Sequence, residues 1–373
     1  MKEIKQIVKS YHELLKSKKK CALATVVHVE GSSYRRSGAR MLIAEDGRLT
    51  GAISGGCLEG DAMRKALFAM NQDCPTLVTY DTMDEEDAII GIGLGCNGII
   101  KVLIEPISYH DESNALELLK KTLDLRQNCV LVTTFNEKNK LQEDSGTKMF
   151  IGENGEIKAA TNFLLSSDFQ INAATRVFEK KSSEWNISIE NGVEQTYFYE
   201  YIRPSVSLVI VGAGNDVQPL ALMADILGWD TTIVDGRANY ATQERFTSAC
   251  QIVVAKPEQV LSQVALDDLT FFALMTHNYN YDKALLYHLV KAKINYTAML
   301  GPRKKLDRIL SEFASEGREL TTKEISTIYS PAGLDIGAET SEEIALSILS
   351  EIQAFVKEKS SASLRYKSMP IHN

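Results

Sequence analysis

The front half of the chain contains an internal duplication, and this repeat constrains the fold more than any other feature of the sequence. A shift of 108 residues aligns residues 21–53 with residues 129–161, and ten of the 33 aligned pairs are identical without a gap. Unrelated segments of this length share roughly two identities, so the match indicates a true repeat. The same supersecondary unit is therefore expected twice, packed against its second copy.

Each repeat has the pattern of a small β-rich unit with one helix. A short apolar strand is followed by a variable loop, a second strand and a tight turn. Asp46-Gly47 and Asn154-Gly155 predict that turn, because both pairs tolerate the positive φ of a type I′ hairpin. A third strand, a helix and closing strands follow in each copy. The pattern predicts an α+β domain over residues 1–204, with repeat units at about 21–106 and 129–204.

Two glycine–cysteine loops belong to the first repeat alone. The first carries Gly55, Gly56, Cys57 and Glu59, and the second carries Gly95 and Cys96. The second repeat has unrelated residues at 162–167 in place of the first loop and lacks the second. The shared architecture tolerates the loss of both loops, so a function explains them better than folding does. Glycines let the backbone approach a ligand closely, and a loop that precedes a helix offers free N–H groups to an anion. Both loops are therefore predicted to bind a cofactor.

Cys57 and Cys96 are the candidate sulfur ligands of a metal. The Cys57 loop runs directly into a helix predicted at 59–70, and a position near a helix N-terminus favours the thiolate, the form that ligates metals or carries sulfur. Cys96 stands among glycines rather than inside a strand. The alternative for each is a small buried apolar side chain. That alternative is favoured for the cysteines on or beside predicted strands, which are Cys21, Cys74, Cys129 and Cys250.

An arginine-rich loop precedes the second strand of the first repeat. Arg35, Arg36 and Arg40 stand close together among serines and glycines. Guanidinium groups bind phosphates and carboxylates through paired hydrogen bonds. The second repeat has Glu143-Asp144 where the first has its arginine pair. The three arginines are therefore predicted to bind an anionic part of the cofactor; the alternative is a solvated hairpin loop.

The back half begins with the pattern of a dinucleotide-binding fold. An apolar run at 207–211 ends in Gly212-Ala213-Gly214, a helical pattern follows, and the next strand ends in Asp235. This order predicts a Rossmann-like, doubly wound parallel sheet over residues 205–373. Val217 replaces the third glycine, so the fingerprint supports the fold more directly than it supports bound NAD or another nucleotide.

The candidate nucleotide-binding residues lie in loops at the predicted carboxyl ends of strands. They are Gly212, Gly214, Asp235, His277 and Arg303. Doubly wound sheets bind their ligands at these strand ends. His277 could serve as an acid, a base or a ligand, or it could be an ordinary hydrogen-bonded loop histidine.

Charge and hydropathy exclude two classes of function. The formal net charge of −8 argues against a nucleic-acid-binding surface, which needs a basic face. No run approaches the length of a membrane-spanning apolar helix, and the N-terminus lacks the apolar core of a signal peptide. The six cysteines form no C-x-x-C pair, which argues against the usual zinc and iron–sulfur sites. We therefore expect a cytoplasmic protein.

Together these motifs resemble those of the XdhC/CoxI family of molybdenum hydroxylase maturation factors. The resemblance runs in the same order over nearly the whole chain. The matching stretches are residues 31–42, 54–60, 95–98, 212–214, 234–237, 275–277, 300–305 and 333–338. Tyr34 and Ser37 stand where the family has prolines, and Asn215 and Asn278 replace polar residues common at the nucleotide end.

The resemblance implies a non-catalytic maturation factor that handles molybdenum cofactor, a molybdopterin. Such a protein protects the cofactor during sulfuration by a cysteine desulfurase and inserts it into an apo molybdenum hydroxylase such as xanthine dehydrogenase. We expect a homodimer. Two alternatives stay open: an NAD-dependent oxidoreductase that uses the glycine loop, Asp235 and His277, and a nucleotide-sensing regulator. Against the enzyme, no Ser–His–acid or Tyr–Lys set is visible.

Overall fold

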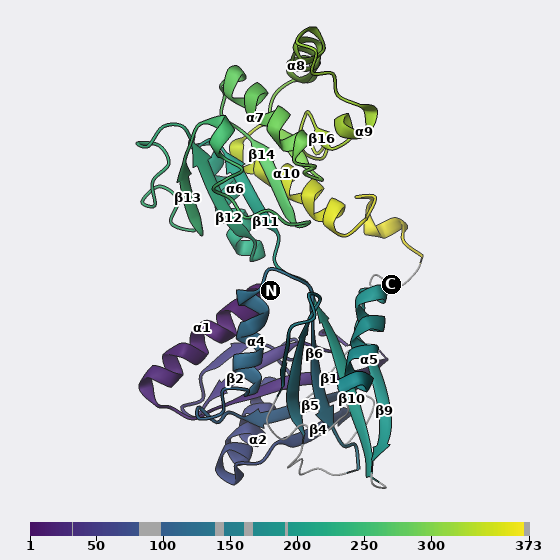
Figure 1. Cartoon of the computed structure of the whole chain (residues 1–373). Helices are drawn as coiled ribbons and strands as arrows, with labels where there is room; N and C mark the ends of the chain where they lie inside the picture. The colour runs from purple at the N-terminus through teal and green to yellow at the C-terminus, as the bar shows by residue number, and fades with distance from the viewer. Residues whose placement is uncertain (32, 82–97, 139–144, 160–166, 191–192, 369–373) are drawn as a thin grey trace. The chain divides into compact units, whose positions relative to one another are not determined.

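Antiparallel sheets make up the first part of the chain and a parallel sheet makes up the second (Figure 1). The computed structural model describes residues 1–31, 33–81, 98–138, 145–159, 167–190 and 193–368. The chain divides into two units, Met1–Pro204 and Ser205–Asn373. An α+β unit with a repeat, followed by a parallel doubly wound unit, confirms the predicted fold class.

The first unit contains two five-stranded sheets, one from each repeat. The strand orders are β3-β2-β1-β5-β4 and β8-β7-β6-β10-β9, so both repeats follow the same path. The strands are β1 (Cys21–Gly31), β2 (Arg40–Ala44), β3 (Leu49–Gly51), β4 (Thr76–Asp81), β5 (Gly98–Pro106), β6 (Cys129–Phe135), β7 (Gly146–Gly152), β8 (Ile157–Ala159), β9 (Glu184–Glu190) and β10 (Val193–Ile202). The helices are α1 (Lys2–Ser17), α2 (Glu59–Gln72), α4 (Ala115–Asp124) and α5 (Ser167–Lys180).

The pairing register of the strands repeats together with their order. Leu23 on β1 pairs with Glu105 on β5. Leu131, which lies 108 residues further along, pairs with Glu200 on β10. Glu105 and Glu200 therefore occupy equivalent positions in the two copies. The duplication seen in the sequence is thus a duplication of structure.

One face of each sheet is covered by the helix of its own repeat. Ala22 and Ala24 on β1 pack against Ala62 and Ala66 of α2. The small alanine side chains let this helix lie close to the sheet. α5 packs on the second sheet in the same way. The opposite faces of both sheets are left to form a common interior.

The two sheets bury that interior between them. At one end α1 and α4 lie side by side, and their Tyr11 and Leu116 are buried against residues of both sheets. At the other end the sheets pack directly on each other through Val27, Leu103 and Phe198. The two repeats therefore share one core and depend on each other for burial.

The second unit is built on a six-stranded parallel sheet of order β13-β12-β11-β14-β15-β16. The strands are β11 (Ser207–Val211), β12 (Asp230–Asp235), β13 (Gln251–Val254), β14 (Thr270–Leu274), β15 (Thr297–Met299) and β16 (Ile328–Tyr329). The helices are α6 (Val217–Leu227), α7 (Tyr279–Lys291), α8 (Arg303–Ser315), α9 (Thr322–Ile325) and α10 (Ser341–Val356), and single 3-10 turns lie at Pro257–Gln259 and Leu364–Tyr366.

Helices cover both faces of the parallel sheet. α6 and α10 bury Leu220 and Ile348 against one face. α7 and α8 bury Leu286 and Ile309 against the other. The strand order reverses at β11, which has β12 on one side and β14 on the other. Ligands of doubly wound sheets bind outside the carboxyl ends of the strands at such a point.

Candidate functional site

The loop before α2 displays Cys57 at the surface of the first unit. Gly56 has a φ of +112°, which few other residues adopt, and the exposed thiol of Cys57 follows it. Ser54 orders this loop, because its Oγ accepts the N–H groups of residues 56–58 at 3.1 to 3.2 Å. The sequence predicted N–H groups open to an anion at this place. The hydroxyl of Ser54 satisfies them instead and holds the loop in one shape.

Glu59, the first residue of α2, anchors the same loop. Its two carboxylate oxygens accept the N–H of Ser54 at 2.8 Å and the hydroxyl of Ser54 at 2.6 Å. Burial acts to raise the pKa of Glu59, but the hydrogen bonds from Ser54 and the backbone outweigh it and hold the pKa below its usual value. Glu59 is therefore an ionised anchor that fixes the position of the Cys57 loop.

The ring of Tyr34 lies against the Cys57 loop. Its nearest atom is 3.4 Å from the position that a Cβ on residue 55 would take, so Gly55 leaves room for the ring. Tyr34 is 71% exposed. An aromatic ring and the loop that carries a thiol are thus brought to one surface. The sequence analysis noted Tyr34 only as a departure from the family's prolines, because its packing against this loop leaves no local signal in the sequence.

The three arginines of the neighbouring loop have separate environments. Arg35 forms an ion pair with Glu3 of α1, and Arg36 is exposed. Arg40 is 1% exposed, and both of its terminal nitrogens bind the carboxylate of Glu200. The prediction that Arg40 binds a cofactor is therefore corrected. This guanidinium is a buried structural cation, because its terminal nitrogens are already engaged inside the unit.

The remaining cysteines differ sharply in exposure. The second predicted loop, with Gly95 and Cys96, lies outside the described residues. Cys21 and Cys129 are 1% exposed, and burial raises the pKa of Cys21 to about 11, so this thiol keeps its proton. Cys250 is exposed in the second unit. Among the described cysteines of the first unit, Cys57 alone is exposed.

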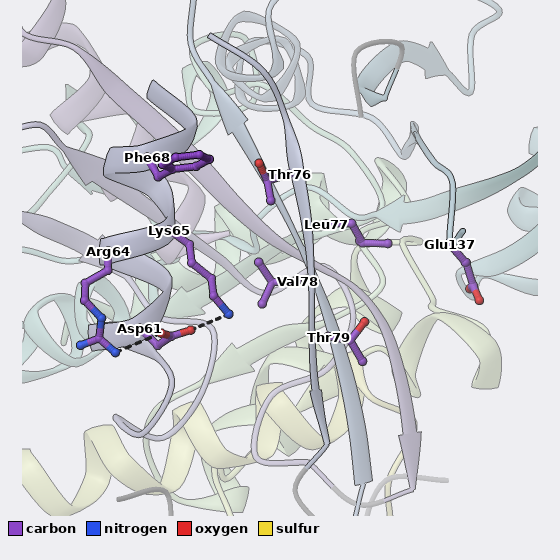
Figure 2. A pocket seen from close by; sticks show the side chains of 9 residues that line it. All are labelled: Asp61, Arg64, Lys65, Phe68, Thr76, Leu77, Val78, Thr79 and Glu137. Carbon is purple, nitrogen blue, oxygen red and sulfur yellow. Dashed lines mark hydrogen bonds and ion pairs between the residues drawn. The ribbon is translucent and has the colours of Figure 1, made fainter. Parts of the chain in front are cut away.

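A cavity of about 510 Å³ opens between α2 and the edge strand β4 (Figure 2). Asp61 on α2 forms ion pairs with Arg64 at 3.0 Å and with Lys65 at 2.9 Å. Glu137, which belongs to the second repeat, also lines the cavity. Phe68 is 56% exposed beside it. Sequence reasoning missed this cavity, because its lining comes from three separate segments. It is a second candidate binding surface on the helix that follows Cys57.

In the second unit the glycine loop, residues 212–214, follows β11, where the strand order of the sheet reverses. Gly212 has a φ of +123°, and a Cβ there would collide with the carbonyl of Met275 after β14. The N–H of Gly212 donates to Val234 and the N–H of Met275 donates to Val211, each at 2.7 Å. The ends of β11, β12 and β14 are thus held together beneath the loop, and only glycine fits at 212.

The acidic residue of the fingerprint is already bound within the protein. Asp235 accepts the N–H of Ala213 at 2.9 Å and three donors of Arg237 at 2.8 to 3.0 Å. Burial acts to raise the pKa of Asp235, but the hydrogen bonds from Arg237 and the backbone outweigh it and hold the pKa low. A ribose diol that approached this strand end would find both carboxylate oxygens engaged.

His277 and Arg303 also have partners within the protein. His277 has a φ of +55°, and its Nε2 lies 2.8 Å from Oδ2 of Asp216. Arg303 begins α8 and donates to Asp307 at 3.2 Å and to the carbonyl of Ser330 at 3.4 Å. The roles of both residues toward a nucleotide stay predictions.

The part of the chain that the structure describes contains neither a cluster of metal-ligating side chains nor a membrane-spanning helix. No group of three or more histidine, cysteine, aspartate or glutamate side chains there is placed to hold a metal ion. No helix in those residues is long and apolar enough to cross a bilayer. A metal that met Cys57 would therefore have to bring most of its own ligands.

A duplicated antiparallel unit with an exposed thiol loop, joined to a Rossmann-like unit, defines a class of two-unit proteins. Residues 208–352 match the family described as the XdhC Rossmann domain, and residues 14–81 match the XdhC and CoxI family. The chain is 33% identical over 339 residues to a probable xanthine dehydrogenase subunit of Bacillus subtilis, covering 91% of this chain and 94% of that protein. The chain belongs to the XdhC/CoxI family.

Two further comparisons agree with this membership. The chain is 27% identical over 342 residues to the molybdenum cofactor insertion chaperone PaoD of Escherichia coli, covering 91% of this chain and 85% of PaoD. The crystal structure of a xanthine dehydrogenase from Bacillus halodurans superimposes with a TM-score of 0.73 at 29% identity, covering 96% of this chain and 98% of that chain. The resemblance inferred from the motifs is confirmed.

Proposed function

We propose that this protein binds molybdenum cofactor and inserts it into an apo molybdenum hydroxylase of the xanthine dehydrogenase type. Membership of the XdhC/CoxI family and the similarity to the insertion chaperone PaoD support this proposal. The observation that carries it is the exposed thiol of Cys57, held by Ser54 and Glu59 on a loop whose glycines and cysteine are not kept in the second repeat.

The surface around Cys57 suits a molybdopterin as cargo. A thiolate is a soft ligand that can bind molybdenum or carry sulfur. The exposed ring of Tyr34 offers a face on which the pterin can stack. Arg36, two residues further along, offers a guanidinium to the pterin phosphate. Because Ser54 already orders the loop, little conformational freedom is lost when the cargo binds.

The finer steps follow from the same surface. The loop protects the cofactor while a cysteine desulfurase supplies its terminal sulfur, and an apo-hydroxylase then receives it. The sulfur chemistry belongs to the desulfurase, so the protein acts as a maturation factor and needs no reaction of its own. A homodimer would present two such loops to its partners.

The cargo retained by the purified protein tests this proposal. The protein is purified gently from cells that make molybdenum cofactor, and molybdenum and released pterin are measured by mass spectrometry. The unaltered chain should retain both in a fixed ratio. Even an outer-shell residue of a metal site costs about tenfold or more in affinity, so Cys57→Ala should lose at least that much. Cys250→Ala, which removes the exposed thiol of the other unit, should retain the cargo. An unaltered chain without molybdenum or pterin would contradict the proposal.

A further inference from the structure

At the end of β12 the guanidinium of Arg237 covers the carboxylate of Asp235. Nε and Nη2 of Arg237 bind the two carboxylate oxygens at 3.0 and 2.8 Å. Asp235 is 4% exposed, whereas half of the Arg237 side chain is exposed. A ligand that approaches this strand end therefore meets a cation, where dinucleotide-binding sheets commonly offer an acid.

Neighbouring side chains hold Arg237 in this position. Its guanidinium lies 4.0 Å from the centre of the Tyr240 ring, and that of Arg245 lies 5.3 Å from the same centre. Arg245 in turn donates to the carbonyl of Ala213 at 2.7 Å and to Oδ1 of Asn215 at 2.9 Å. Among the described residues, Nη1 of Arg237 has no hydrogen-bond partner. One edge of a fixed guanidinium is thus left for a ligand.

The glycine loop itself is poorly suited to an anion. The side chain of Asp216 lies over Gly214, so that a Cβ added to residue 214 would collide with Oδ1 of Asp216. Oδ2 of Asp216 is paired with His277 at 2.8 Å. In dinucleotide-binding sheets the pyrophosphate occupies this place, at the start of the first helix. A carboxylate there disfavours a phosphate on the 5′ side of a nucleotide, so the cation that can receive a phosphate is Arg237.

We propose that the second unit binds a nucleotide through a phosphomonoester on the 2′- or 3′-hydroxyl of its ribose, and that Arg237 selects this group. A guanidinium binds a phosphate through paired, charge-assisted hydrogen bonds. The partly exposed ring of Tyr240 and the arginines stacked on it offer a surface for the base. A ribose with both hydroxyls free would need the oxygens of Asp235, which are engaged. This second ligand adds to cofactor insertion and does not depend on it.

Three isomers of adenosine monophosphate test the proposal. The 2′, 3′ and 5′ isomers have the same composition and charge and differ only in the position of the phosphate. Calorimetric titration of the full chain should show that the 2′ or the 3′ isomer binds at least about tenfold more tightly than the 5′ isomer, the effect of one charge-assisted hydrogen bond. The tighter of the two identifies the hydroxyl that carries the phosphate in the natural ligand.

Variants of Arg237 then assign the selection to this side chain. Arg237→Ala should abolish the preference, and Arg237→Lys, which keeps the charge but loses the fork, should retain only part of it. Arg318→Ala is the matched control, because Arg318 is 53% exposed and also stacks on a tyrosine, Tyr287, at 5.0 Å. It should leave the preference unchanged.

Three results would overturn the proposal: a 5′ isomer that binds at least as tightly as the other two, no binding of any isomer at millimolar concentration, or a preference that survives in Arg237→Ala. The first two use the unaltered chain, so they do not depend on the folding of a variant. None of the titrations involves molybdenum, so failure here is distinct from failure of the proposed cofactor insertion.

Discussion

Arg40 of the first repeat and Glu200 of the second are joined by a buried ion pair in which both terminal nitrogens of Arg40 bind the carboxylate. Glu105, the counterpart of Glu200, reaches in the opposite direction and accepts the N–H of Thr147 at 2.6 Å. Equivalent glutamates therefore cross between the repeats in both directions. The polar groups of the shared interior belong to the duplication itself and tie its copies together.

Removal of Glu200 should destabilise the first unit strongly. Glu200→Ala leaves the guanidinium of Arg40 buried without its counter-ion, and breaking one side of a buried pair costs about 3–5 kcal/mol. The free energy of unfolding, measured by urea denaturation, reports this loss. Arg48→Ala breaks a solvent-exposed pair with Asp46 and should leave the free energy nearly unchanged. Equal effects of the two variants would show that the buried pair has no special role.

Glu105 should make the stability of the first unit depend on pH. Burial raises its pKa above the usual 4.5, despite the hydrogen bonds from Thr147. The folded state thus keeps a proton that the unfolded chain has lost. The contribution of Glu105 to the free energy of unfolding is complete below the pKa that the group has in the unfolded chain. It falls as the pH rises through the pKa that the group has in the folded state. Glu105→Gln has no proton to lose, so its stability relative to the unaltered chain should rise over that window. If the urea midpoints of Glu105→Gln and of the unaltered chain changed with pH in parallel, the pH dependence would not come from Glu105.

Gly212 should tolerate no side chain. In Gly212→Ala the methyl group meets the carbonyl of Met275 and the backbone has a positive φ, and together these should cost about 2–4 kcal/mol. Gly317→Ala is the control, because its φ is also positive but no atom lies within 4 Å of the added carbon. It should cost only about 1 kcal/mol, from backbone strain alone. Thermal unfolding of the second unit separates the two effects, and equal costs would exclude the steric contact.

Ser54 should position the thiol of Cys57. Ser54→Ala removes the acceptor of the N–H groups of residues 56–58, and loss of a side-chain hydrogen bond costs about 0.5–1.5 kcal/mol. The rate at which a thiol reagent modifies Cys57 should change with it, since the loop loses its single shape. Ser54→Thr keeps the hydroxyl and should retain the original rate. An unchanged rate in Ser54→Ala would show that the loop is ordered by other contacts.

The fold could be predicted because its signals are local or repeated. Ten identities at one offset revealed the duplication, and the order of strand, glycine loop, helix and strand revealed the Rossmann unit. The environment of Arg40 could not be predicted, because its partner lies 160 residues away. The engagement of Asp235 was hidden for another reason. The sequence shows Arg237 two residues further on, but it does not show that the side chain folds back over the acid.

At the Cys57 loop, too, some features could be predicted from the sequence and others could not. The second repeat does not keep its glycines and cysteine, which marked the loop as functional, and the exposed thiol is consistent with that prediction. The sequence did not show that Ser54 satisfies the N–H groups that seemed open to an anion, because a hydroxyl can turn toward its own loop or away from it. Tyr34 reaches the loop through tertiary packing, which no local pattern records.

The most direct test of cofactor insertion is the activation of a cofactor-free molybdenum hydroxylase. The apo-hydroxylase is mixed with the cofactor-loaded chain, and the activity gained is measured over time. The amount of molybdenum added is the same for every variant. We predict that the unaltered chain and Cys250→Ala activate the hydroxylase at the same rate, and that Cys57→Ala, with unchanged thermal stability, fails to do so. Activation by Cys57→Ala at the rate of the unaltered chain would contradict the central claim that this thiol handles the cargo.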